Sequence, residues 1–181
     1  ANDNLTGTYA AVCALRMLDM AGIDFENTEV CAMITDGEEA GLRGCKQWAK
    51  DHYDEYVNSG VETAVLCVDT LADLEYLRVY NKDMTGTVKN NQQFSQLVMD
   101  SAKDSGHNDL EFSSVYFGSS DAAAFSQAGI TATCLAAMDP KPADYYHNRR
   151  DTAERLVPEA IKTGFDVIIS TILNFDEKGL N

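Results

Sequence analysis

Acidic side chains and one histidine occupy four short stretches that are spread from one end of the chain to the other. They are Asp3, the pair Glu38 and Glu39, Asp69, and His147. Two divalent ions held close together need several carboxylate oxygens, including a shared carboxylate, and an imidazole. The residue types and their order therefore indicate a site that could hold two metal ions and use them for hydrolysis.

The spacing of apolar residues alternates between that of helices and that of strands along the chain. Helical patterns cover residues 8–21, 41–56, 90–104, 121–127 and 157–175, and strand patterns cover residues 28–35, 62–69, 74–80, 110–117 and 130–136. We expect the strand at 74–80 to lie at an edge of the sheet. This alternation predicts an α/β fold, a three-layer sandwich whose mostly parallel central sheet is flanked by helices. No internal repeat or linker divides residues 1–181, which predicts one domain.

The candidate residues stand where strands are predicted to end. Glu38 and Glu39 directly follow one predicted strand, and Asp69 ends the next one. His147 follows the last predicted strand through a connecting loop, and Asp3 lies just before the first helix. In open α/β sheets, ligands gather at the carboxyl ends of the strands. We therefore expect these side chains to meet at one rim of the sheet.

The composition is that of a globular protein. The chain has 181 residues, of which 45% are hydrophobic, and three prolines, so it can bury a sizeable core. No apolar run approaches the roughly 18 to 20 residues of a spanning helix, so no membrane segment is expected. The chain begins without Met and shows no basic and apolar leader, so a signal peptide is either absent or already removed. The compartment, cytoplasmic or exported, stays open.

The charge balance restricts the classes of partner. Twenty-nine acidic and fourteen basic residues give a net charge of -15, which argues against nucleic acid as a partner. A cationic ligand, such as a metal ion or a peptide amino terminus, suits this charge, although the charge could also serve solubility alone. The five cysteines form no CxxC motif, so neither a disulfide framework nor a thiolate zinc site is indicated.

Taken together, the motifs resemble those of the M28 family of zinc-dependent metallopeptidases, and the resemblance extends from Asp3 to the final helix. The matching stretches are Asn2-Asp3-Asn4 with Gly7, Asp36-Gly37-Glu38-Glu39-Ala40-Gly41-Leu42-Arg43-Gly44, Val68-Asp69, Ser120-Asp121 with Phe125, Gly129-Ile130, and Tyr146-His147 with Asp151-Thr152. The resemblance implies a zinc-dependent exopeptidase fold, an aminopeptidase activity, peptide substrates and two zinc ions.

The resemblance also assigns a role to each candidate. Asp3 would bridge two zinc ions, Glu39 and His147 would complete the ligands of one ion, and Asp69 would serve the other. Glu38 would be the general base, because a carboxylate that binds no metal can accept a proton more easily than one that does. Around these residues, Asp151 would orient His147, and Asp121 and Tyr146 would line the substrate site.

One departure concerns the second zinc ion. The family supplies a further histidine ligand from a His-x-Asp segment that precedes the stretch of Asp3, and neither His52 nor His107 stands in a matching context. The chain therefore resembles the C-terminal part of a longer M28-like catalytic domain that lacks its N-terminal strands. Substrate side-chain preference and oligomeric state do not follow from the sequence.

Each candidate also has a structural explanation. Asp3 could cap the first helix, the paired glutamates could favour a helix N-terminus, Asp69 could begin a turn, and Asp151 could cap a short segment. At the level of the whole chain, two alternatives to an aminopeptidase remain. One is a catalytically silent, peptidase-like binding domain, and the other is a glutaminyl-cyclase-like enzyme on the same scaffold.

Overall fold

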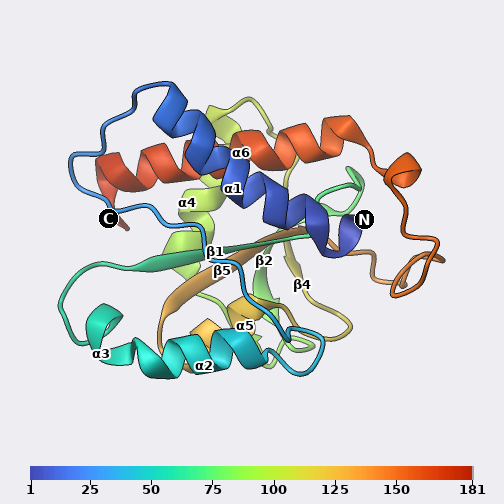
Figure 1. Cartoon of the computed structure of the whole chain (residues 1–181), viewed down its shortest axis with the longest axis horizontal. Helices are drawn as coiled ribbons and strands as arrows, with labels where there is room; N and C mark the ends of the chain where they lie inside the picture. Colours follow the sequence, from blue (N-terminus) through green and yellow to red (C-terminus); the bar gives the residue numbers. More distant parts are fainter. Residues whose placement is uncertain (181) are drawn as a thin grey trace.

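A computed structural model describes residues 1–180 of the chain, which form a sheet covered by helices on both faces (Figure 1). The five strands are β1 (Ala64–Asp69), β2 (Leu77–Asp83), β3 (Val88–Lys89), β4 (Phe112–Ser114) and β5 (Thr131–Ala137). They are paired in the order β1-β5-β2-β3, and β4 also pairs with β2. The pairs β1–β5 and β2–β4 are parallel, whereas β2 runs antiparallel to β5 and to β3. The predicted α/β fold with a central sheet flanked by helices is confirmed.

The helices form the two outer layers. One face of the sheet carries α1 (Gly7–Met20), α4 (Gln92–Asp104) and α6 (Pro158–Lys178), and the other carries α2 (Arg43–Asp51), the short α3 (Tyr53–Tyr56) and α5 (Asp121–Gln127) (Figure 1). Two helical turns, Asn2–Thr6 and Ala153–Arg155, complete the set. Each layer buries its own apolar cluster. Leu77, Val79 and Val167 belong to the first cluster, and Tyr80 and Phe125 belong to the second.

Three expected elements differ in the structure. Residues 28–35, predicted as a strand, form no regular structure, because no strand within residues 1–180 pairs with them and an isolated strand leaves its backbone groups unpaired. The strand predicted at 74–80 begins at Leu77 and lies inside the sheet, between β5 on one side and β3 and β4 on the other. The helix predicted at 41–56 is divided at His52, whose φ of -111° interrupts it.

The pairing of β1 with β5 determines where the candidate residues lie. The parallel register runs from Ala64 opposite Thr131 to Asp69 opposite Ala136, so the carboxyl ends of both strands reach the same rim. The loop after β5 leads to His147, and the first residues of the chain lie at the same end of the molecule (Figure 1). Among residues 1–180, no helix is long and apolar enough to cross a membrane.

Candidate active site

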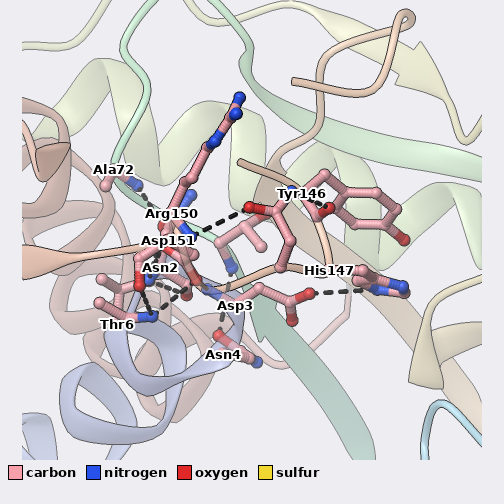
Figure 2. A network of polar contacts seen from close by, with 12 residues as sticks. Asn2, Asp3, Asn4, Thr6, Ala72, Tyr146, His147, Arg150 and Asp151 are labelled. Carbon is pink, nitrogen blue, oxygen red and sulfur yellow. Dashed lines mark hydrogen bonds and ion pairs between the residues drawn. The ribbon is translucent and has the colours of Figure 1, made fainter. Parts of the chain in front are cut away.

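Asp3, Glu39 and His147 converge at the rim of the sheet, although they come from three distant parts of the chain. Each offers one ligand atom, and these atoms all lie within 4.8 Å of one another. Nε2 of His147 lies 2.6 Å from Oε1 of Glu39 and 3.3 Å from Oδ2 of Asp3. Figure 2 shows the Asp3 carboxylate directed at the His147 ring. The three side chains line a hollow of about 530 Å³.

Asp3 is positioned by its neighbour Asn4, which attaches the segment to the end of β1. The Asn4 amide donates a hydrogen bond to the Val68 carbonyl at 3.0 Å, and its Oδ1 accepts hydrogen bonds from the backbone N–H groups of Gly7 and Thr70. Gly7 permits this close packing, because a Cβ atom there would lie 2.3 Å from the Val68 carbonyl oxygen. The motif Asn-x-x-Gly therefore joins the start of α1 to the strand that carries Asp69.

Asp151 holds the same segment from the opposite side. Its carboxylate accepts hydrogen bonds from the backbone N–H groups of Asn2 and Asp3 at 2.9 and 3.0 Å (Figure 2). It also accepts one from the Ala1 amino group at 2.6 Å. Burial raises the pKa of Asp151, but these hydrogen bonds outweigh it and leave the pKa below its usual value. Within residues 1–180, Asp151 makes no hydrogen bond to His147. Its acceptors are used by the segment of Asp3, and the role of orienting His147 stays a prediction.

Glu38 and Glu39 lie in a tight turn that leads into α2. The backbone N–H groups of Gly41 and Leu42 both donate to the Glu38 carbonyl, at 2.9 and 2.8 Å. Gly44 allows the turn to close, because a Cβ atom there would lie 2.4 Å from the backbone oxygen of Asp36. The glycines of the paired-glutamate motif thus place one carboxylate, Glu39, against His147 while Glu38 remains half-buried beside it.

The histidine has an unusual backbone conformation. The φ of His147 is +54°, a left-handed value that side-chain-bearing residues adopt at some cost and that is often found at functional sites. Its ring stacks on Tyr146, with the ring centroids 3.8 Å apart. Burial and the nearby Glu39, Asp3 and Glu38 carboxylates raise the pKa of Tyr146 to about 12. Its hydroxyl is therefore a hydrogen-bond donor beside the site at neutral pH.

Carboxylates that crowd below the rim have raised pKa values. Burial, followed by the charges of Asp3 and Glu38, raises the pKa of Asp69 to about 8. Burial, followed by the charges of Asp121 and Glu39, raises the pKa of Glu38 to about 7. A general base is most effective when its pKa lies close to the working pH. The surroundings of Glu38 thus suit the role that the sequence predicts for it.

Asp121 lies at the start of α5, where its Oδ2 accepts a hydrogen bond from the Thr35 hydroxyl at 2.9 Å. The residue before it, Ser120, is held by Asp83, whose buried carboxylate accepts from the Ser120 hydroxyl at 2.6 Å and from its backbone N–H at 3.1 Å. Thr35 and Asp83 were not among the sequence-derived candidates. Asp83 ends β2 and is fully buried, so its carboxylate needs hydrogen-bond partners. The sequence does not show this burial, because the strand predicted at 74–80 ends before Asp83.

Two histidines lie apart from this cluster. Nδ1 of His52 lies 2.9 Å from a Glu55 oxygen, and Nε2 of His107 lies 3.0 Å from Oδ2 of Asp166, between α4 and α6. Neither histidine lines the hollow at the rim. The structure thus brings together one imidazole with several carboxylates.

This donor set suits a divalent cation such as zinc. Two carboxylates and an imidazole approach one point from different segments, and zinc takes nitrogen and oxygen ligands of these kinds. Asp69 is not one of the three residues whose ligand atoms converge, but it lines a neighbouring cavity together with Asp3 and Glu39. Its Oδ1 is buried and has no hydrogen-bond partner within residues 1–180, so a cation could satisfy this oxygen. A cation would also oppose the mutual repulsion that raises the pKa values of Asp69 and Glu38.

Comparison with protein families identifies the class of protein that this fold and site define. The model of peptidase family M28 matches residues 1–172. The chain belongs to peptidase family M28. No curated protein matches the chain.

Solved structures share the fold at low sequence identity. The LapA aminopeptidase of Legionella pneumophila is 15% identical, with a TM-score of 0.76 over 98% of this chain and 47% of its own. The zinc aminopeptidase BSAP of Bacillus subtilis is 20% identical, with a TM-score of 0.67 over 94% of this chain and 41% of its own. A glutaminyl cyclase from an Acidobacteriales bacterium is 18% identical, with a TM-score of 0.60 over 76% of this chain and 47% of its own. The chain spans about half the length of these structures or less.

Proposed function

We propose that the protein is a zinc-dependent aminopeptidase that removes N-terminal residues from peptides. The observation that carries the proposal is the convergence of Asp3, Glu39 and His147, whose ligand atoms lie within 4.8 Å of one another. Membership of peptidase family M28 and the aminopeptidases among the solved structures support the same reaction. The net charge of -15 suits a substrate with a free, positively charged amino terminus.

In this proposal the acidic residues and the histidine have two roles, metal binding and proton transfer. Asp3, Glu39 and His147 hold one zinc ion, and Asp3 and Asp69 offer oxygens to a second. Zinc, when bound, supplies Lewis-acid polarisation of the scissile carbonyl and activation of the attacking water. Glu38 accepts the proton of the water and passes it to the leaving amine as the C–N bond breaks.

Two neighbouring residues complete the proposed site. The Tyr146 hydroxyl donates a hydrogen bond to the substrate carbonyl oxygen, where negative charge develops. Asp121 keeps the surroundings of Glu38 acidic and so helps to hold its pKa near 7. Asp151 acts at a distance from the substrate, since it fixes the backbone that carries Asp3.

The proposal includes a ligand that lies outside residues 1–181. A second zinc ion needs a further imidazole, which we expect from a His-x-Asp segment that precedes Asp3 in a longer catalytic domain. The 181-residue chain should therefore bind at most one zinc ion tightly and hydrolyse substrates slowly. An extended protein that carries such a segment should hydrolyse aminoacyl-p-nitroanilides and lose activity to chelators. Robust activity with two zinc ions in the 181-residue chain would instead require His52 or His107 as the missing ligand.

Zinc binding by the 181-residue chain tests the site independently of turnover. Isothermal titration should show one tight zinc site, and His147→Ala should weaken it by at least about 100-fold, since one of few protein ligands is lost. His107→Ala is the matched control, because this imidazole contacts Asp166 on α6 and not the site. Equal zinc affinity of the two variants would end the metal-site proposal.

A second candidate is a glutaminyl-cyclase-like reaction, which the likeness to a glutaminyl cyclase at a TM-score of 0.60 favours. A peptide with N-terminal glutamine distinguishes the two reactions. An aminopeptidase releases free glutamine, whereas a cyclase releases ammonia and leaves a pyroglutamyl peptide of unchanged length. If neither product forms with the zinc-loaded extended protein, the chain is a silent binding domain.

A further inference from the structure

Asp83 is a buried carboxylate that the proposed mechanism does not use. It is fully buried, and within residues 1–180 its partners are neutral donors. These are the Met84 backbone N–H at 2.8 Å, the Ser120 backbone N–H at 3.1 Å and the Ser120 hydroxyl at 2.6 Å. Burial raises the pKa of Asp83, although these hydrogen bonds oppose the shift. Burying a carboxylate without a positive partner is costly, and some proteins retain such groups because they fix one arrangement of the chain.

Ser120 connects Asp83 to α5. It stands at the N-cap position of that helix, where a serine hydroxyl usually accepts a hydrogen bond from the first turn. In this protein the Ser120 side chain makes no capping bond, and its hydroxyl donates to Asp83 instead. The two hydrogen bonds to Asp83 hold both the backbone and the side chain of Ser120. Asp83 therefore determines where α5 begins, and with it the place of Asp121, the first residue of the helix.

Asp121 in turn holds the segment that leads to the turn of Glu38 and Glu39 (the paired-glutamate turn). Its Oδ2 accepts a hydrogen bond from the Thr35 hydroxyl at 2.9 Å. Within the described chain, this is the one hydrogen bond that joins residues 28–36 to the sheet or to a helix other than α2. The helix that follows the turn, α2, packs on α5 (Figure 1). Both supports of the paired-glutamate turn therefore depend on the place of α5.

We propose that Asp83 is a positioning residue for the proposed reaction: it fixes the start of α5, so that Asp121 holds Thr35 and keeps the paired-glutamate turn in place. The effect on turnover rests on the proposed function, in which Glu38 takes a proton from water. Asp83 itself contacts neither substrate nor zinc. A displacement of about 1 Å in a catalytic group can cost about 100-fold in rate, so a residue that fixes this turn contributes to catalysis.

Thr35→Val tests the far end of this series of contacts, because it keeps the shape of the side chain and removes only the hydroxyl. In the extended protein at saturating zinc, kcat should fall by about 10-fold and KM should stay within about 2-fold, since the base is displaced but substrate binding is not. Thr87→Val is the matched control. Its hydroxyl donates to the Met84 carbonyl, in the turn that follows Asp83, and not to α5, so this variant should keep the wild-type kcat.

A double-mutant cycle shows whether Asp83 acts through Thr35. Asp83→Ala should lower kcat at least as much as Thr35→Val does. Combining the two should cause little further loss, because residues that act through one contact have non-additive effects. If Asp83→Ala does not fold, Ser120→Ala takes its place in the cycle, since it removes only the hydroxyl that Asp83 accepts. Losses that multiply in the double variant would overturn the proposal.

Amide exchange in the 181-residue chain tests the position of the turn without turnover. The backbone N–H groups of Arg43 and Gly44 donate to carbonyls of the segment before Glu38. In Thr35→Val, both amides should exchange at least about 10-fold faster than in the wild-type chain, whereas the amide of Val98 in α4 should not change. Unchanged exchange of Arg43 and Gly44 would overturn the proposal. Faster exchange, together with an extended protein that hydrolyses no substrate, would support the positioning of the turn and contradict only the proposed function.

Discussion

Asp151 and Asp3 are 148 residues apart in the sequence, and the Asp151 carboxylate accepts a hydrogen bond from the Asp3 backbone N–H at 3.0 Å. The same carboxylate binds the N–H of Asn2. Because Asp151 lies in the same loop as His147, this contact joins the two segments that carry Asp3 and His147. The relative position of two proposed zinc ligands thus depends on a residue that contacts neither of their side chains.

Asp151→Asn should weaken zinc binding by about 10-fold to 100-fold, as is common when a group that positions a ligand is lost. The amide keeps one acceptor oxygen but replaces the other with a donor that faces backbone N–H groups. Isothermal titration of the 181-residue chain measures the effect. Asp144→Asn is the control, because that carboxylate lies in the same loop and contacts Arg155. Unchanged affinity in Asp151→Asn would show that other contacts position Asp3.

Glu38→Gln in the extended protein should retain zinc and lose at least about 100-fold in turnover, as expected when a general base is removed. The substitution preserves shape and removes only the ability to take a proton. Turnover of an aminoacyl-p-nitroanilide and zinc content measure the two effects separately. Glu26→Gln, in an exposed loop, is the control. Zinc content and activity that both stay near wild type would exclude Glu38 as the base.

The stability of the metal-free chain should fall as pH rises from about 4 to about 8. The folded pKa of Asp69 is about 8 against an ordinary 3.8, so between these values the folded state binds more protons than the unfolded state. Stability then decreases with pH, at a rate of up to about 1.4 kcal/mol per unit for one such group. Glu38 contributes in the same direction up to about pH 7.

Urea unfolding at pH 5 and pH 8 in the presence of a chelator measures this dependence. Asp69→Asn removes the titrating group and should flatten the curve relative to wild type, while the general effect of net charge remains in both proteins. Asp109→Asn, at an exposed position in the turn after α4, controls for the loss of one charge. Identical slopes for wild type and Asp69→Asn would contradict the pKa assigned to Asp69.

Gly7→Ala should destabilise the chain by several degrees and weaken zinc binding, because the new Cβ atom would lie 2.3 Å from the Val68 oxygen and displace the segment of Asp3. The backbone oxygen of Val68 cannot move away easily, since it belongs to β1. Thermal unfolding and zinc titration measure the two effects. Leu5→Ala, which truncates an exposed side chain of the same segment, should change neither. A Gly7→Ala protein with wild-type stability would show that the segment can shift freely.

Local patterns predicted the helices better than the sheet. The pattern at 121–127 matches α5, and Pro158 begins α6 as the N-terminal preference of proline suggests. The strand pattern at 28–35 gave no strand, because strand formation depends on a distant partner that residues 1–180 do not supply. For the same reason, the place of β2 inside the sheet could not be read from its own residues.

In the candidate site, the convergence of the ligands could be predicted from the sequence, whereas the contacts that position them could not. Asp3, Glu39 and His147 were expected to meet because each follows or precedes an element whose end reaches one rim, and the structure brings them together. The partner of Asp151 could not be predicted, since a sequence shows which groups can accept hydrogen bonds but not which backbone amides lie opposite them. The contact between Thr35 and Asp121 likewise joins two segments whose approach only the fold determines.

The distribution of Asp3, Glu39 and His147 along the chain has a consequence for unfolding. An ion can bind all three residues only in the folded chain, because in the unfolded chain it would have to close two long loops to reach them, and closing such loops costs entropy. Bound metal would thus act as a reversible crosslink between the beginning, the middle and the end of the polypeptide. The melting temperature should then depend on the concentration of free zinc. Above the dissociation constant, it should rise by a roughly constant increment for each tenfold increase in free zinc.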